Sequence, residues 1–240
     1  MKLETNHKSI LVIPDLQIPY HHPDAIRFLV SASAEYWPDE IISIGDEVDQ
    51  YGLSRFPKDP DEDSAGRELE QSLKVLGELY EEFPDVRSVT SNHLLRIFKK
   101  AEGAGIPKGY LKSIKEFMGA PKGWSWNEEV YLDGIKFEHG DACAGLMGYR
   151  ALAESNRCST CVGHHHSSAG IHYLSNGKEV IFAMNVGCLV DQNARAFAYT
   201  RESRHKPVLS CGLIKYGAPI IVPMITKSNG RWDSKNQVWP

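Results

Sequence analysis

The 240-residue chain has no long apolar run: no stretch approaches the roughly 20 consecutive apolar residues that span a bilayer. Polar residues 6–8 (Asn-His-Lys) stand where the hydrophobic region of a secretory signal would lie. These absences predict a cytoplasmic protein without a membrane partner.

Cysteine is also scarce. The five cysteines are an odd number and lie in apparent strands or beside small residues. Cys158 and Cys161 form a CxxC pair, but no second pair accompanies it. We therefore expect reduced thiols rather than a disulfide framework or a structural zinc site.

The chain carries no basic stripe of the kind that supplies most nucleic-acid affinity. Its formal net charge is −4, and its longest charged stretch, residues 59–63, is acidic. Polymeric nucleic acid is therefore the less expected partner. With 42% hydrophobic and 24% charged residues, the composition predicts one globular domain over residues 1–240.

Hydrophobic periodicity predicts strands that alternate with helices at first, followed mainly by strands. This order indicates an α/β fold class, with a two-layer β core flanked by helices. Helices are expected at 23–34, 69–83 and 147–154, with two more inside 94–118. Strands are expected at 9–13, 41–44, 86–90, 130–132, 135–137, 158–162, 171–174, 180–185, 209–216 and 220–225.

Polar side chains follow each of the first three expected strands. In open α/β sheets, ligands bind beyond the carboxyl ends of the strands, so these residues can converge on one site. They are Asp15 and Gln17, then Asp46 and Asp49, then Asn92 and His93.

Two later segments add imidazoles. They contain His139 and the run His164-His165-His166. In an extended segment His164 and His166 point to the same side, whereas His165 points away. Oxygen and nitrogen donors without thiolates suit ions such as Mn²⁺, Fe²⁺, Zn²⁺ or Mg²⁺.

These five blocks, in this order from Asp15 to His166, resemble the calcineurin-like metallophosphoesterases. The family pattern is Asp-x-His, Gly-Asp-x-x-Asp, Gly-Asn-His followed by an acidic residue, a single His, and Gly-His-x-His. The resemblance implies a four-layer αββα architecture, that is, a two-sheet β sandwich flanked by helices.

The resemblance also implies a cofactor of two divalent ions, Mn²⁺ first, with Mg²⁺, Co²⁺, Fe²⁺ or Zn²⁺ as alternatives. Such a pair can clamp a phosphoryl group and activate a bridging water. By position, Asp15, Asp46 and His166 look like ligands of one ion, with Gln17 at the place of a family histidine. Asp46 would bridge to the second ion, whose other ligands would be Asn92, His139 and His164.

The resemblance assigns catalytic roles next to these ligands. His93 looks like the general acid that protonates the leaving oxygen, and Asp49 would accept its other ring proton. Arg96 matches an arginine that some phosphatase members place on the substrate phosphate. Asn92, His93 and Arg96 are therefore the expected substrate-binding residues.

Four positions depart from the family pattern. Gln17 replaces a histidine, so the first ion gains an amide oxygen or loses a ligand; His21 or His22 could substitute. Ser91 replaces a glycine, at little cost if its φ is negative. Leu94 replaces an acidic residue, which predicts a less anchored loop, and Gln50 stands where phosphatases often carry a second arginine.

Simpler structural roles compete with these assignments. Asp15 and Asp46 could be helix N-caps, and Asp49 and Arg96 could be surface residues. His21, His22 and His172 are expected to be loop or surface histidines. Four aromatic residues could stack a nucleobase or could pack in the core: Trp124, Trp126, Tyr110 and Tyr149.

The sequence therefore predicts an enzyme, a metal-dependent phosphoric ester hydrolase. Because the chain is compact and acidic, we expect a phosphomonoesterase acting on a small nucleotide such as a nucleoside 5′-monophosphate, that is, a 5′-nucleotidase. One alternative is a phosphodiesterase or nuclease with the same site. Another is a non-catalytic metal-binding interaction protein.

Overall fold

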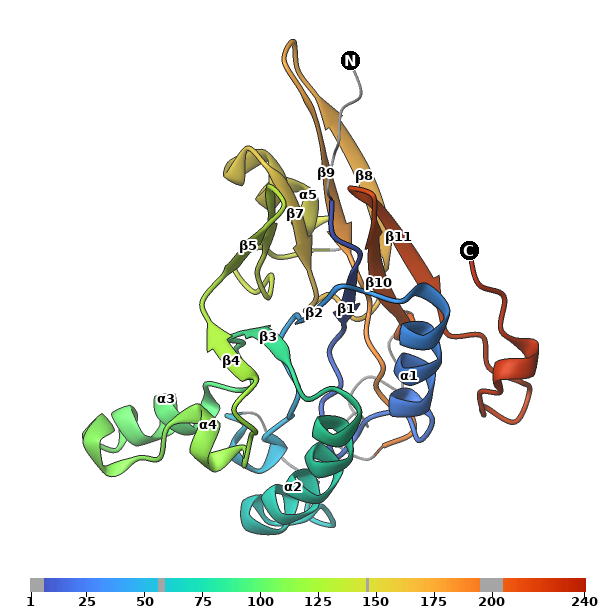
Figure 1. The fold of residues 1–240 in the computed structure, drawn as a ribbon. Helices are drawn as coiled ribbons and strands as arrows, with labels where there is room; N and C mark the ends of the chain where they lie inside the picture. Colours follow the sequence, from blue (N-terminus) through green and yellow to red (C-terminus); the bar gives the residue numbers. More distant parts are fainter. Residues whose placement is uncertain (1–6, 56–58, 146, 195–204) are drawn as a thin grey trace.

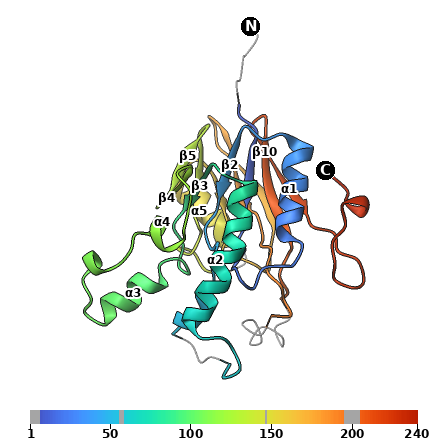
Figure 2. The same ribbon diagram turned by 60° about the horizontal axis from the view of Figure 1, so that its bottom comes forward.

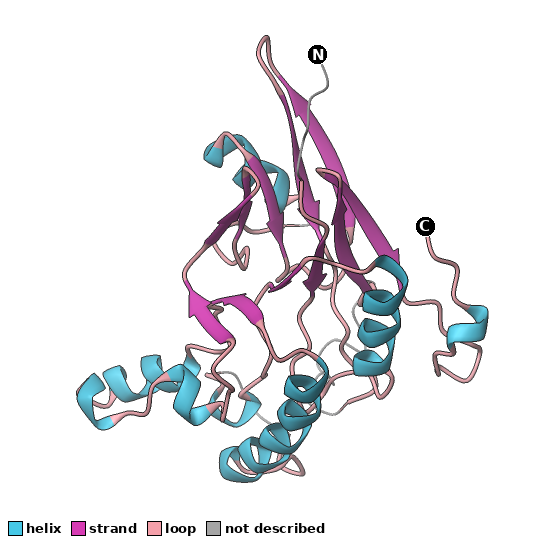
Figure 3. Ribbon diagram, in the orientation of Figure 1, coloured by secondary structure: helices cyan, strands magenta, loops and turns pink. Residues whose placement is uncertain are grey.

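A computed structural model describes residues 7–55, 59–145, 147–194 and 205–240. Two β-sheets form the centre of the molecule, and helices pack on their outer faces (Figure 1; Figure 3). This architecture confirms the expected α/β sandwich with a two-layer β core. The assignment of residues 1–240 to a single domain stays a prediction.

The first sheet has six strands in the order β11-β10-β1-β2-β3-β4. The strands β1 to β4 are parallel, whereas β10 pairs antiparallel with β1 and β11 antiparallel with β10. Their bounds are β1 Ile10–Ile13, β2 Glu40–Ser43, β3 Val86–Val89, β4 Trp124–Asn127, β10 Ser210–Lys215 and β11 Ala218–Pro223.

The second sheet has five strands in the order β5-β6-β7-β9-β8. Its central strands β6, β7 and β9 are parallel, and the edge strands β5 and β8 are antiparallel to their neighbours. Their bounds are β5 Val130–Leu132, β6 Ile135–Phe137, β7 Ser159–Val162, β8 Gly170–Ser175 and β9 Val180–Asn185.

Alternation along β1 explains how the layers pack. Successive side chains of a strand point to opposite faces. Ile10 and Val12 lie in the core between the sheets, together with Phe137 of the second sheet, whereas Leu11 and Ile13 belong to the core under the helices. All five side chains have no exposed surface.

Three helices cover the sheets. The crossover helices α1 (Ala25–Tyr36) and α2 (Ala65–Glu82) pack on the outer face of the first sheet, and α5 (Gly148–Asn156) packs on β7 and β9 (Figure 1). A separate arm of α3 (Arg96–Gly103) and α4 (Ile114–Phe117) projects beside the body (Figure 2). Single 3₁₀ turns are η1 (Tyr51–Leu53), η2 (Lys108–Tyr110) and η4 (Ser234–Asn236).

Most expected elements are present with ends shifted by a few residues, but β4 was not expected. Its four residues, Trp124–Asn127, are too few and too polar to show a clear pattern. They form a strand because they pair in parallel with β3 from Val86 to Val89. Pairing with β3, rather than the pattern of its own side chains, therefore makes this segment a strand.

The tryptophans of β4 pack in the core. Trp124 is 1% exposed, and its indole N–H donates to the Phe83 carbonyl oxygen at 2.7 Å. Its ring packs against those of Tyr80 and Trp126. The packing interpretation is therefore confirmed for this pair, whereas Tyr110 is 84% exposed.

All five cysteines are free thiols, as expected. Within the described residues, no helix has both the length and the apolar character needed to cross a bilayer.

Candidate metal centre

The five motif blocks follow the carboxyl ends of β1, β2 and β3 in one sheet and of β6 and β7 in the other. Each set of strands is parallel, so each delivers its blocks to one edge of its sheet. The side chains that converge there are Asp15, Gln17, Asp46, Asn92, His139, His164 and His166.

A first group consists of Asp15, Asp46 and His166, whose ligand atoms all lie within 4.8 Å of one another. His166 Nε2 is 2.9 Å from Asp15 Oδ2. The side-chain amide of Gln17 lies beside them, with Nε2 3.2 Å from Asp46 Oδ2 and 3.5 Å from His166 Nε2. The four residues expected around the first ion are thus in contact.

A second group surrounds His139. Its Nε2 lies 2.8 Å from Asn92 Oδ1, 3.2 Å from His164 Nδ1 and 3.4 Å from Asp46 Oδ2. Asp46 therefore belongs to both groups, which is the position that a bridging carboxylate requires.

The charges of this cluster are strongly coupled. Burial disfavours the Asp46 carboxylate, yet the positive charges of His139 and His93 outweigh burial and hold the pKa of Asp46 well below its usual value. Burial likewise opposes a charged His139, but the Asp46 carboxylate raises the pKa of His139 to about 10. Burial and the charge of His139 lower the pKa of His164 to about 4. The buried carboxylates thus attract positive charge to this position.

Two buried oxygens show that the donor set fits a cation. Asp15 Oδ1 and Gln17 Oε1 have no hydrogen-bond partner among the described residues. An unpaired buried acceptor costs about 1–3 kcal/mol, which a bound cation offsets. A 180° turn of the Gln17 amide exchanges its oxygen and nitrogen, bringing the oxygen close to Asp46 and His166.

His139 is oriented as metal-binding histidines usually are. Its Nδ1–H donates to the Ile44 carbonyl oxygen at 2.9 Å, so Nε2 is the atom that faces Asn92 and Asp46. A backbone acceptor on the far nitrogen fixes both the ring orientation and the tautomer in metal sites.

The backbone around the centre is strained. Gln17, Asp46, Gln50 and His164 have φ values between 50° and 63°, a left-handed conformation that non-glycine residues rarely adopt. Such strain concentrates at functional sites, where the surrounding structure maintains it. Gly163 is required for a different reason: a Cβ there would lie 2.2 Å from Asp15 Oδ1.

His93 lies next to the centre, with Nε2 3.9 Å from Asp46 Oδ2. Its Nδ1–H donates to the Asp49 backbone carbonyl at 2.9 Å, whereas the Asp49 carboxylate is 3.4 Å away. The expected carboxylate acceptor is therefore corrected: the nearest acceptor is the main chain of Asp49. The tautomer is held as predicted, with Nε2 turned to the site.

Arg96 contacts His93 and Asp49. Its NH1 donates to the Asp49 carboxylate at 3.0 Å and to the Asp49 carbonyl at 2.9 Å, and its NH2 lies 2.9 Å from His93 Nε2. In this conformation the guanidinium links the loop after β2 to the loop after β3. A role of Arg96 on a substrate phosphate stays a prediction and requires these contacts to open.

Two positioning residues were not expected from the sequence. Ser91 Oγ accepts from the Asp46 N–H at 2.9 Å and from the Leu94 N–H at 3.3 Å, so the residue in place of the family glycine ties two blocks together. Asn185, fully buried at the end of β9, donates to the carbonyls of His165 and Ser168. The sequence signal that could have identified them is a polar residue at or just after the end of a strand.

The Leu94 expectation is wrong. Leu94 has no exposed surface and packs in the core under the helices, so burial anchors the loop that an acidic residue was expected to hold. Its carbonyl also accepts from the Gln50 amide at 3.0 Å.

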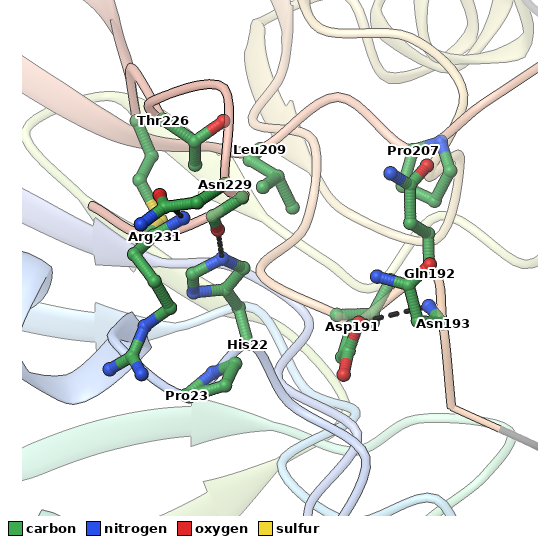
Figure 4. Close-up of a pocket in the computed structure, with 13 residues that line it drawn as sticks. His22, Pro23, Asp191, Gln192, Asn193, Pro207, Leu209, Thr226, Asn229 and Arg231 are labelled. Atoms are coloured by element: carbon green, nitrogen blue, oxygen red, sulfur yellow. Dashed lines mark hydrogen bonds between the residues drawn. The ribbon is translucent and has the colours of Figure 1, made fainter.

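His21 and His22 do not complete the first group, which in the described part of the chain is the only cluster of its kind. His22 lines a separate cavity of about 380 Å³ beside Asp191 and Arg231 (Figure 4). Its Nε2 bonds to the Gly230 carbonyl oxygen at 2.8 Å (Figure 4). It is 6% exposed and lies in the loop before α1, so it is a loop histidine, one of the two expected roles, and not a surface one.

Gln17→His should strengthen the first ion site. Histidine tolerates a positive φ better than most residues, and imidazole favours Zn²⁺ or Co²⁺ over Mg²⁺ more than an amide oxygen does. In titration calorimetry of metal-free protein we expect the affinity for Zn²⁺ to rise by about tenfold or more, with little change for Mg²⁺. Gln71→His on the exposed face of α2 is the control. Unchanged Zn²⁺ affinity would show that residue 17 is not a ligand.

No protein-family model matches the chain, and no curated protein matches it. Among solved structures, it resembles the phosphoesterase YfcE from E. coli, with 13% identity over 86% of this chain and 88% of that one and a TM-score of 0.42. It also resembles Vps29 from Chaetomium thermophilum, with 13% identity over 94% of this chain and 93% of that one and a TM-score of 0.47. The nuclease MPE from Pseudomonas putida is 11% identical over 88% of this chain and 85% of that one, with a TM-score of 0.35.

All of these similarities are distant. The five blocks that resemble the calcineurin-like metallophosphoesterases meet at one centre.

Proposed function

We propose that this chain is a metal-dependent phosphoester hydrolase. The observation that carries the proposal is the shared position of Asp46 between two groups of oxygen and nitrogen donors, one with Asp15 and His166 and one with His139. Gln17, Asn92 and His164 complete the donor set. The proposed cofactor is a pair of divalent ions, with Mn²⁺ as the leading candidate.

Divalent ions held here would polarise a phosphoryl group and offset the charge that develops on it. The residues of the chain supply the remaining functions. The Ile44 carbonyl and Ser91 hold His139 and Asp46 in place. His93, fixed through Nδ1, would donate a proton from Nε2 to the leaving oxygen once the Arg96 NH2 that lies 2.9 Å from Nε2 has moved away.

We propose phosphodiesters as the preferred substrates. A terminal phosphate carries a second negative charge, which phosphatases neutralise with arginine. Here Arg96 is bonded to Asp49 and His93, and the Gln50 amide is taken up by the Leu94 carbonyl and the Ile97 N–H. Among the residues that the structure describes, neither position thus offers a free side-chain cation for the second charge in this conformation. A nucleoside 5′-monophosphatase, the expectation from the sequence, is the competing candidate.

Hydrolysis of bis-p-nitrophenyl phosphate and of p-nitrophenyl phosphate by Mn²⁺-loaded protein compares the two candidates. A charge-assisted hydrogen bond contributes about 1.5–3 kcal/mol. We therefore expect kcat/KM to be at least about tenfold higher for the diester. Phosphate release from a panel of nucleoside monophosphates checks the competing candidate directly. Faster monoester turnover in either assay would refute the diester preference.

A further inference from the structure

The α3–α4 arm, residues 96–122, has a charge opposite to that of the whole chain. Two of its side chains are acidic, Glu102 and Glu116, so its formal net charge is +5 although the chain carries −4. Its seven basic residues are Arg96, Lys99, Lys100, Lys108, Lys112, Lys115 and Lys122. The overall charge of −4 does not show this basic segment, because acidic residues elsewhere in the chain outweigh it.

The arm begins at the metal centre. Its first helical residue, Arg96, bonds to His93, which directly follows the candidate ligand Asn92. Residues three and four positions apart share one face of a helix, so Lys99 and Lys100 lie one turn beyond Arg96 on the same face. From there the arm projects away from the sheets in both views (Figure 1; Figure 2). A basic face therefore leads outward from the catalytic residues.

The positive charge of the arm is available to a partner. Five of its lysines are exposed, and none of the five forms an ion pair within the described residues. Lys115 is different, because its ammonium group donates to the carbonyls of Lys122 and Trp124. Glu116 is occupied in a capping box with Ser113. The five exposed lysines are Lys99, Lys100, Lys108, Lys112 and Lys122.

The tip of the arm also exposes apolar surface. Tyr110 is 84% exposed and Ile106 is 44% exposed, although the base of the arm is anchored by the contact between Phe98 and Phe117 and by the buried Met118. The exposed tyrosine makes no contribution to that anchoring. An aromatic face among unpaired lysines is typical of surfaces that bind single-stranded nucleic acid, since bases stack on the ring and phosphates lie on the cations.

We propose that the α3–α4 arm binds single-stranded nucleic acid and guides it to the metal centre, so that the substrate class is a polynucleotide. This inference rests on the proposed phosphodiester hydrolysis. Charge complementarity favours a strand with one phosphate per nucleotide over a small nucleotide, which would be too short to contact both the metal centre and the tip. Eight residues of α3 alone extend about 12 Å from the site.

Fluorescence anisotropy with a 12-nucleotide oligothymidylate tests the arm, with EDTA present so that the strand is not cleaved. For single strands, log K falls with log[salt] with a slope of about −0.7 for each neutralised phosphate. The triple variant Lys99→Gln, Lys100→Gln, Lys108→Gln should therefore reduce the slope by about 2. Tyr110→Ala should weaken binding by about fivefold or more.

A matched control removes the same charge elsewhere. Lys74, Lys178 and Lys235 are exposed and lie outside the arm, and Lys→Gln at all three should leave the salt slope unchanged. Equal slopes for the two triple variants would overturn the proposal, as would no binding by the wild type or tighter binding of a duplex of equal length.

Hydrolysis of bis-p-nitrophenyl phosphate separates this proposal from the proposed function. That small diester has a single phosphate, which the metal centre would hold, so it does not need the lysines of the arm and both triple variants should hydrolyse it at the wild-type rate. Oligonucleotide cleavage should instead show a KM raised by about tenfold or more in the arm variant alone. Wild-type diester activity together with an unchanged oligonucleotide KM would refute the arm and leave the hydrolase assignment intact.

Discussion

Asp46→Asn is expected to abolish metal binding and hydrolysis together. Asp46 Oδ2 lies 3.2 Å from the Gln17 amide nitrogen and 3.4 Å from His139 Nε2, so one carboxylate serves both donor groups. Asparagine keeps the shape but removes the charge that attracts two cations. Because even residues behind the ligands change metal affinity by about 10–100-fold, we expect a loss of at least about 100-fold in Mn²⁺ affinity and in kcat/KM.

Metal analysis after dialysis and titration calorimetry measure the first effect, and hydrolysis of bis-p-nitrophenyl phosphate measures the second. Thermal melts in EDTA provide the folding control. The variant removes the charge that pairs with His139 and His93, so it should melt at a lower temperature than the wild type, and a cooperative melt above the assay temperature shows that it is folded. Asp85→Asn changes the same charge at an exposed position and should behave as wild type. If Asp46→Asn hydrolysed the diester at the wild-type rate, the activity would not come from this centre, and a non-catalytic role of the centre would be favoured.

His93→Ala is expected to keep the metal ions and slow turnover by about 10²–10⁴, the range of general acid–base catalysis. The ring contacts Asp46 only at 3.9 Å and is held by the Asp49 carbonyl, so its removal takes away a proton donor rather than a ligand. The loss should appear in kcat, with KM and metal stoichiometry close to those of the wild type.

The leaving group distinguishes a proton donor from a structural residue. Nitrophenolate leaves without protonation, so the loss in His93→Ala should be smaller for bis-p-nitrophenyl phosphate than for a diester with an alkyl leaving group. His172→Ala on β8 is the control. An equal loss with both substrates would refute the general-acid role of His93.

The convergence of the proposed ligands could be predicted from the sequence because each one follows a core strand. Asp15, Asp46 and Asn92 come two or three residues after β1, β2 and β3. A parallel sheet brings such positions to one edge whatever the remaining packing, so local patterns suffice to predict the convergence. The spacing of His164 and His166 predicts a common side only for an extended segment. His164 instead has a left-handed φ of 63°, so the conformation of the loop brings both rings to the centre.

The partners of these ligands could not be predicted in the same way. The Asp49 main chain as acceptor for His93, and the hold of Ser91 on Asp46, depend on the register between loops from different strands. Asn185 is 19 residues beyond His166 in the sequence, yet its amide holds the loop that contains His166 through the carbonyls of His165 and Ser168. Such contacts follow from tertiary packing, which has no local signature.

Some features of the candidate centre are therefore determined by the sequence alone, and others only by the tertiary structure. Residue identity and strand order already place a carboxylate-imidazole centre with Asp46 at its middle. The orientation of the Gln17 amide, the engagement of Arg96 by Asp49 and the projection of a basic arm from an acidic chain depend on three-dimensional placement. The physical reason is that strand periodicity is a property of neighbouring residues, whereas hydrogen-bond choice and charge segregation depend on which distant segments share a surface.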